Sequence, residues 1–251
     1  MSAPSRRHVL VPVPLDRFAD TAAGLVLDAA EEAVRRRGTF RLALAGGSTP
    51  RQVHGALRDD ARTRSPDVAR WDVWFGDERC VPASDPGSNF RMADETLLSG
   101  LVSQPRVHRV RTELGTPTDI AEAYEAELVR ELGGGPGVPP VLDLVLLGMG
   151  PDGHTASLFP GDPVLHETRR LVAAVRGPKP PADRVTLTLP VLCAARLVLF
   201  LVTGADKAEA VRDVLAPGHP SRLPAALVVP TAGVVAWLLD EAAARLLPPP
   251  G

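Results

Sequence analysis

The chain has 251 residues, of which 45% are hydrophobic and 23% are charged, and its 28 basic side chains nearly balance 30 acidic ones. This length is enough to bury a core without disulfide or metal staples, and the net charge of −2 excludes a general nucleic-acid-binding protein, which would be basic. No apolar run reaches the roughly 20 residues of a membrane span. Two distant cysteines, Cys80 and Cys193, do not suit a disulfide framework or a cysteine metal site. We therefore expect a cytoplasmic globular protein that binds neither nucleic acid nor membrane.

The predicted elements alternate between helices and strands along the chain. His8 to Pro14, the first apolar segment, is too short and too interrupted by proline for a signal peptide. After it, apolar residues occur either at helical spacing or in the short runs typical of buried strands. They predict helix 16–37, strand 40–45, helix 50–59, strand 71–76, helix 88–99, strand 107–110, helix 117–132 and strand 142–148. The second half continues with strands 171–175, 184–189 and 196–203, helix 205–215, strand 233–239 and helix 240–247.

This alternation indicates an α/β fold with a mostly parallel, Rossmann-like sheet covered by helices on both faces. The Gly/Pro-rich stretch 133–140 has the length of a loop, so we expect one domain over residues 1–251. In such sheets ligands bind beyond the carboxyl ends of the strands. The loops that follow strands are therefore the places to expect a functional site.

The first of these loops joins strand 40–45 to helix 50–59. Gly46 and Gly47 let backbone N–H groups approach a ligand, and Ser48 or Thr49 caps a helix whose N-terminus attracts anions. The glycine spacing fits neither a Walker loop nor a dinucleotide fingerprint. Taken alone, a tight turn with a helix cap is an equally good interpretation.

The second loop begins with three charged residues, Asp77, Glu78 and Arg79, directly after a predicted strand. A charge run is most often a solvated loop, but this one is placed where a parallel sheet presents functional groups. Ser88 and Asn89 follow and begin the next helix, a role that structure alone would explain.

The third loop, after strand 142–148, has the glycine-rich backbone of an unusual turn. His154 stands in its middle, where a general base for neutral pH would be placed, although a lone histidine is more often structural. Asp152 could simply form a turn. Among the cations, Arg184 is at the start of a strand. Lys207 lies in the first turn of a helix, where the helix dipole disfavours a cation, and a bound anionic ligand would offset this repulsion.

Taken in this order, the motifs closely resemble those of the 6-phosphogluconolactonase family. The resemblance rests on Gly46-Gly-Ser-Thr-Pro50, Gly76-Asp-Glu-Arg79 with Ser88-Asn89, the long segment from Gly148 to Pro160, and Arg184-Val-Thr-Leu-Thr188. It spans residues from about 8 to 245, and the long segment is highly specific. We expect a stand-alone lactonase rather than one fused to a dehydrogenase.

The resemblance implies the fold of glucosamine-6-phosphate deaminases and ribose-5-phosphate isomerases. It also implies hydrolysis of 6-phospho-D-glucono-1,5-lactone to 6-phospho-D-gluconate in the oxidative pentose phosphate pathway, without a metal or organic cofactor. His154 is then the base that activates water, Asp152 orients the imidazole or shapes its loop, and Arg79 steadies the oxyanion or the sugar ring. The residues left to bind the sugar phosphate are Gly46, Gly47, Ser48, Thr49, Asp77, Ser88, Asn89, Arg184 and Lys207, with Ser48, Thr49, Arg184 and Lys207 on the phosphate itself.

Two alternatives remain open. A glucosamine-6-phosphate deaminase/isomerase would use the carboxylate of Asp77 as a base, but Arg79 and the segment Thr155 to Pro160 favour the lactonase. A non-catalytic sugar-phosphate sensor would usually carry a DNA-binding segment, for which the chain has no basic helix. The expected partner is a small sugar-phosphate lactone, and we expect a monomer or weak dimer with no obligate protein partner.

Overall fold

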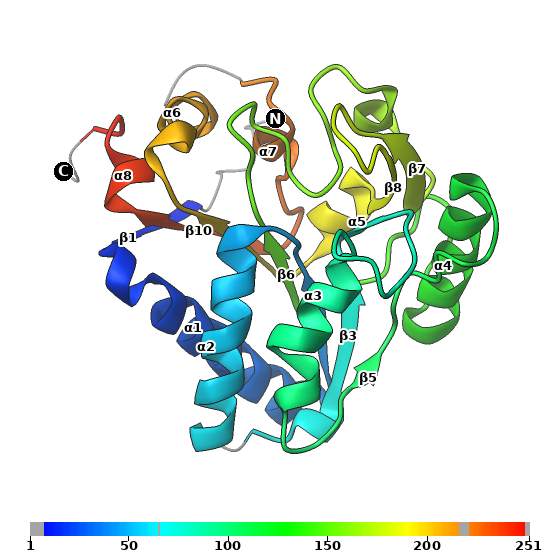
Figure 1. Cartoon of the computed structure of the whole chain (residues 1–251), viewed down its shortest axis with the longest axis horizontal. Coiled ribbons are helices and arrows are strands. Elements are labelled where there is room, and N and C mark those ends of the chain that lie inside the picture. Colours follow the sequence, from blue (N-terminus) through cyan, green and yellow to red (C-terminus); the bar gives the residue numbers. More distant parts are fainter. Residues whose placement is uncertain (1–7, 65, 216–220, 249–251) are drawn as a thin grey trace.

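The computed structural model describes residues 8–64, 66–215 and 221–248, which form two sheets and the helices around them (Figure 1). The larger sheet is parallel, in the order β1-β10-β9-β6-β2-β3-β5, and the smaller is antiparallel, in the order β4-β8-β7. The strands of the larger sheet are β1 (His8–Val13), β2 (Phe40–Leu44), β3 (Trp71–Phe75), β5 (Arg106–Val107), β6 (Leu144–Leu147), β9 (Leu197–Val202) and β10 (Val234–Asp240). Those of the smaller sheet are β4 (Asp77–Arg79), β7 (Val172–Arg176) and β8 (Asp183–Leu187).

Long helices pack beside the sheets. α1 and α2 lie against each other, and α4 packs on the smaller sheet (Figure 1). The α-helices are α1 (Leu15–Arg37), α2 (Ser48–Arg64), α3 (Asn89–Thr96), α4 (Pro117–Leu132), α5 (Leu189–Ala194), α6 (Ala208–Leu215), α7 (Pro224–Leu227) and α8 (Glu241–Ala244). Short 3-10 turns are η1 (Val68–Arg70), η2 (Leu98–Gly100), η3 (Pro163–His166) and η4 (Ala205–Lys207). Within the described ranges, no helix is long and apolar enough to cross a membrane.

Apolar side chains cover both faces of the larger sheet. Every residue of β3 and β6 is buried, as are five of the six residues of β9. Phe200 of β9 stacks on Trp237 of β10, with ring centroids 3.8 Å apart. Strands that are buried on both faces are typical of parallel sheets. The predicted α/β fold with a mostly parallel sheet is therefore confirmed.

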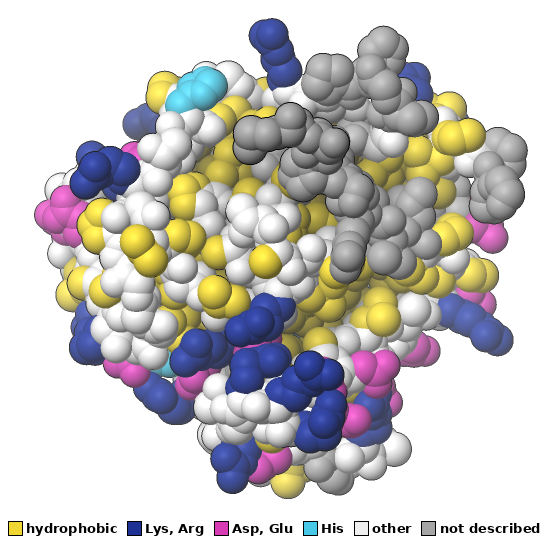
Figure 2. Space-filling model, turned by 180° about the vertical axis from the view of Figure 1, so that it is seen from behind, with side chains coloured by type: hydrophobic (Ala, Val, Ile, Leu, Met, Phe, Trp, Pro, Cys, Tyr) yellow, Lys and Arg dark blue, Asp and Glu magenta, His cyan; other side chains and the backbone are white. Residues whose placement is uncertain are grey.

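Charged residues of both signs gather on part of the outer surface. Figure 2 shows Lys and Arg side chains interspersed with Asp and Glu toward the lower end of the rear face. Asp143, directly before β6, is buried and pairs with Arg37 Nε at 2.8 Å and Arg196 Nε at 3.3 Å. The mixed charge of this face agrees with the small net charge of the chain.

Three parts of the structure differ from the sequence prediction. Residues 8–13 form an edge strand, β1, because an edge position tolerates a proline such as Pro12. Residues 77–79, interpreted as a charged loop, form β4. The strands expected at 171–175 and 184–189 form a separate antiparallel sheet, in which the second pairs with both the first and β4, rather than joining the parallel one.

Most of the other differences concern where helices begin and end. α2 begins at Ser48 and continues to Arg64, beyond the predicted residues 50–59. The helix expected at 88–99 ends at Thr96 and is followed by η2, and the helix expected at 205–215 begins with the 3-10 turn η4. Two short helices, α5 and α7, were not predicted, because each spans too few residues for a helical pattern.

Candidate active site

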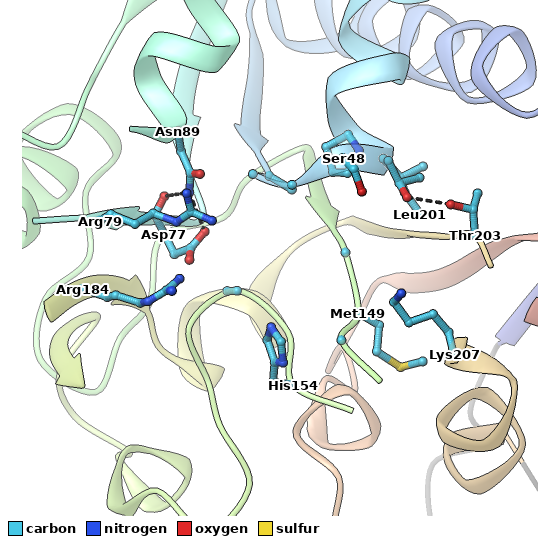
Figure 3. Close-up of a pocket in the computed structure, with 18 of the residues that line it drawn as sticks. Ser48, Asp77, Arg79, Asn89, Met149, His154, Arg184, Leu201, Thr203 and Lys207 are labelled. Atoms are coloured by element: carbon cyan, nitrogen blue, oxygen red, sulfur yellow. Dashed lines mark hydrogen bonds between the residues drawn. The ribbon is translucent and has the colours of Figure 1, made fainter. Parts of the chain in front are cut away.

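A pocket of about 380 Å³ opens at the carboxyl ends of β2, β3, β6 and β9 (Figure 3). This is where parallel sheets bind ligands. Two residues of the predicted site, Asp152 and Ser88, do not line the pocket. All the others do: Gly46, Gly47, Ser48, Thr49, Asp77, Arg79, Asn89, His154, Arg184 and Lys207. Loops that are distant in sequence therefore meet in one pocket, as the strand-end rule predicts.

The turn between β2 and α2 is packed so closely that it requires glycine. A Cβ atom on Gly46 would lie 2.0 Å from the Asn89 side-chain oxygen, and Gly47 has a φ of 106°, which favours glycine. Thr49, in the first turn of α2, has its Oγ1 2.7 Å from Thr203 Oγ1 at the end of β9. The first N–H groups of α2 carry partial positive charge. This turn therefore forms a part of the pocket that attracts anions.

The loop after β6 holds His154 in a compact turn. The Gly150 N–H donates to the His154 carbonyl oxygen at 2.9 Å, and a Cβ on Gly150 would lie 2.2 Å from the imidazole ring. Asp152 Oδ1 lies 2.5 Å from His154 Nδ1 and accepts a second hydrogen bond from the His154 backbone N–H at 3.3 Å. Asp152 therefore contacts both the imidazole and the loop, although it lies outside the pocket.

The charge state of Asp152 sets which nitrogen of His154 can act as a base. Burial favours the neutral acid, but the hydrogen bond and the charge of His154 outweigh burial and lower the pKa of the Asp152 carboxyl. An ionised carboxylate holds a proton on the imidazole Nδ1. Nε2 is then the ring nitrogen that can accept a proton from a ligand.

Arg79 and Arg184 stand opposite each other on β4 and β8, and we call them the arginine pair. Arg79 Nη1 donates to the Gly87 carbonyl oxygen at 2.6 Å, whereas the Nε atoms of both arginines are buried without a hydrogen-bond partner among the described residues. Burial lowers the pKa of the Arg184 guanidinium, with Asp77 opposing the shift and Arg79 adding to it. Two adjacent, partly desolvated cations favour an anionic ligand.

Asp77, two residues before Arg79 on β4, is buried. Its Oδ2 accepts a hydrogen bond from Ser157 Oγ at 2.6 Å, and its Oδ1 accepts one from Asn89 Nδ2 at 3.0 Å. Ser157 was not predicted as a site residue, because its partner is distant in sequence. Both carboxylate oxygens of Asp77 are therefore engaged by the protein itself.

Glu78, also absent from the predicted site, organises the start of α3. Its carboxylate accepts hydrogen bonds from the backbone N–H groups of Arg79 and Asn89, each at 2.7 Å, and from Ser88 Oγ at 3.0 Å. Burial raises the pKa of Glu78 in spite of these bonds. Ser88 also caps α3 by accepting from the Arg91 N–H, so the contacts of Ser88 are those of a helix cap.

On the other side of His154 from the arginine pair lie Thr203 and Lys207 (Figure 3). Lys207 Nζ donates to Asp206 Oδ2 at 2.5 Å, and this bond lowers the pKa of the exposed Asp206. Thr203, Asp206 and Met149 line the pocket but were not predicted. Thr203 directly follows β9, so the strand-end rule could have found it, whereas no pattern singles out Met149.

The pocket is therefore cationic on two sides, with an imidazole between them. This arrangement suits an elongated anionic ligand whose middle is presented to a base. Within the part of the chain that the structure describes, no three His, Cys, Asp or Glu side chains gather as a metal site would require.

Known proteins resemble this chain over most of its length. Residues 15–237 match the profile of a family described as glucosamine-6-phosphate isomerases/6-phosphogluconolactonase. The chain is 41% identical over 254 aligned positions to a 6-phosphogluconolactonase of Bos taurus, covering 100% of this chain and 97% of the relative. It is 43% identical over 217 positions to one of Homo sapiens, covering 85% and 83%. The solved 6-phosphogluconolactonase from Trypanosoma cruzi superposes with a TM-score of 0.88 at 28% identity, covering 98% of this chain and 99% of that one.

Proposed function

The chain belongs to the glucosamine-6-phosphate isomerase/6-phosphogluconolactonase family, and on that premise we propose that it hydrolyses 6-phospho-D-glucono-1,5-lactone to 6-phospho-D-gluconate in the oxidative pentose phosphate pathway. Relatives of which it covers 97% and 83% carry the name of this activity. The observation that carries the proposal is His154, held by Asp152 between two cationic sides of one pocket.

His154 supplies the base of the reaction. Its neutral Nε2 takes a proton from the water that attacks C1 of the lactone, while Asp152 holds Nδ1–H and stabilises the imidazolium. When the tetrahedral intermediate collapses, the bond between C1 and the ring oxygen breaks, and the imidazolium returns its proton to that oxygen. The sequence has no G-x-S-x-G nucleophile elbow, which agrees with direct attack by water.

The two cationic sides bind the two ends of the substrate. Ser48, Thr49 and Lys207 hold the phosphate, with help from the N–H groups at the start of α2. The arginine pair steadies the oxyanion on C1 and then the carboxylate of the product. The sequence alone places Arg184 among the expected phosphate ligands, but its pairing with Arg79 and its position across His154 from Lys207 favour the carbonyl end.

An assay on two substrates tests this proposal. The purified chain should hydrolyse freshly prepared 6-phospho-D-glucono-1,5-lactone well above the spontaneous rate and release no ammonia from glucosamine 6-phosphate. Ammonia release without lactone hydrolysis would overturn the proposal in favour of the deaminase, in which Asp77 acts as a base. The engagement of Asp77 by Ser157 and Asn89 favours the lactonase.

We further propose that residues 1–251 act as one catalytic domain in the cytoplasm, as a monomer or weak dimer with no metal, cofactor or obligate protein partner. After a chelator has been added and then removed by gel filtration, the protein should keep full activity. In sedimentation it should behave as one or two chains. Activity that returns only when a metal ion is added back would contradict the proposal.

A further inference from the structure

The turn that carries His154 is tied to the rest of the pocket by a side chain that the mechanism above does not use. Ser157, three residues after the histidine, is fully buried, and its Oγ donates to Asp77 Oδ2 at 2.6 Å. Its backbone N–H donates to Thr186 Oγ1 of β8 at 3.3 Å. Ser157 therefore joins the loop after β6 to the two strands, β4 and β8, that carry the arginine pair.

Asp77 extends this connection to a third loop. Asn89 Nδ2 donates to Asp77 Oδ1 at 3.0 Å and to the Asp77 carbonyl oxygen at 2.9 Å. Asn89 in turn packs against Gly46 so closely that no Cβ fits there. The ladder between β2 and β3 ends at Leu44 and Phe75, before these loops begin. The Asp77 carboxylate therefore joins loops that the parallel sheet itself does not align.

We propose that Ser157 is a positioning residue for lactone hydrolysis, which through Asp77 fixes His154 relative to the arginine pair. The inference rests on the proposed function. A base displaced by about 1 Å can lose about 100-fold in rate while the substrate still binds. Asp77 is then a clamp between loops and not a ligand of the substrate. This role also suits its charge, because a carboxylate repels an anionic substrate.

Three variants of the full chain test the clamp: Ser157→Ala, Asp77→Asn and the double variant. An asparagine has one acceptor oxygen where the carboxylate has two, so residue 77 could no longer accept from Ser157 and Asn89 on separate oxygens. In Ser157→Ala, kcat should fall about 10- to 100-fold while KM changes less than about twofold. The kcat of the double variant should be little lower than that of the slower single variant, because both changes break the same hydrogen bond.

Thr188→Val is the matched control, since it also replaces a buried hydroxyl by an apolar group. Thr188 is fully buried, and its Oγ1 donates to the Arg170 carbonyl oxygen at 2.6 Å, outside the pocket. It should lower the midpoint of thermal unfolding about as much as Ser157→Ala does and leave kcat unchanged. Equal kcat losses in the two variants, or an unchanged kcat in Ser157→Ala, would overturn the inference.

The design separates this inference from the proposed function. If the wild-type chain hydrolyses the lactone and Ser157→Ala behaves like Thr188→Val, the clamp is wrong and the lactonase stands. If the wild-type chain has no lactonase activity, the proposed function itself fails. Should Ser157→Ala not fold, the same division between kcat and KM is measured in Asp77→Asn, where an unchanged kcat overturns the clamp.

Discussion

The two cationic sides of the pocket are built in opposite ways. The arginine side (Arg79 and Arg184) projects from paired strands, with Nε atoms that are buried and unpartnered within the described residues. The lysine side (Ser48, Thr49 and Lys207) comes from turns and the first turn of a helix, and Lys207 already pairs with an exposed carboxylate. The comparison indicates that the arginine side is ready for an anion before it binds. On the lysine side, Lys207 must exchange its pairing with Asp206 for a pairing with the anion.

The largest effect is expected between the two sides, at His154. In His154→Asn the side chain stays polar but can no longer accept a proton, so kcat should fall about 10²- to 10⁴-fold with little change in KM. Steady-state kinetics on the lactone measure both constants. His166→Asn, a change in η3 outside the pocket, is the control. A wild-type kcat in His154→Asn would show that neither side presents the substrate to this residue.

The second effect tests the arginine side. Arg184→Met removes a guanidinium that is in place before the oxyanion forms, so kcat/KM should fall about 100-fold, mostly through kcat. Arg176→Met changes an arginine of the same small sheet whose side chain is 80% exposed, and it should have no effect. A loss confined to KM would place Arg184 with the phosphate ligands, as the sequence alone suggested.

A smaller effect is expected on the lysine side. Lys207→Met should raise KM about 10-fold, the size of one charge-assisted hydrogen bond, and leave kcat within about threefold, because the phosphate takes no part in bond breaking. Arg212→Met on α6, where Arg212 pairs with Asp213, is the matched change of an exposed cation. If Lys207→Met loses as much kcat as Arg184→Met, the two sides do not differ in the way proposed.

The smallest effect concerns the stability of α2, which supplies Ser48 and Thr49 of the lysine side. His54 is fully buried, and burial followed by the charge of Arg51 lowers its pKa to about 4. In the unfolded chain the same imidazole binds its proton near pH 6.5. The contribution of neutral His54 to the free energy of unfolding is therefore fully present above this pH and is lost as the pH falls toward 4. Between pH 7.5 and 5.5 this lowers the free energy of unfolding by about 1 kcal/mol.

Urea unfolding at the two pH values measures this change. His54→Leu fills the same buried site without a titrating group, so its free energy of unfolding should depend less on pH than that of the wild type. An equal pH dependence in both proteins would show that other groups cause the acid sensitivity.

The parallel sheet could be predicted from the sequence, and the antiparallel sheet could not. A parallel strand is apolar on both faces, so β9 appears as an uninterrupted run, and the helix expected at 117–132 has the bounds of α4. β4 consists of Asp77, Glu78 and Arg79, which are strand residues only because distant groups satisfy them. Asp77 and Ser157 are 80 residues apart, and no local pattern connects them.

The same limit applies to the site. The strand-end rule locates its loops, because that rule depends only on the direction of the strands. The pairing of Arg79 with Arg184 depends on the register of β4 against β8, which the sequence does not contain. The contact of Asp152 with His154 could be anticipated, since the two residues are two positions apart, whereas Glu78 gained its importance only through bonds to the start of α3.

The hydrogen bond between Thr49 and Thr203 joins residues that are 154 positions apart. The pocket therefore cannot form on the nascent chain until most of the polypeptide has left the ribosome. Contacts between residues so distant in sequence also form slowly. Recovery of catalysis after dilution from denaturant would thus report the last stage of folding, later than the return of helical circular dichroism.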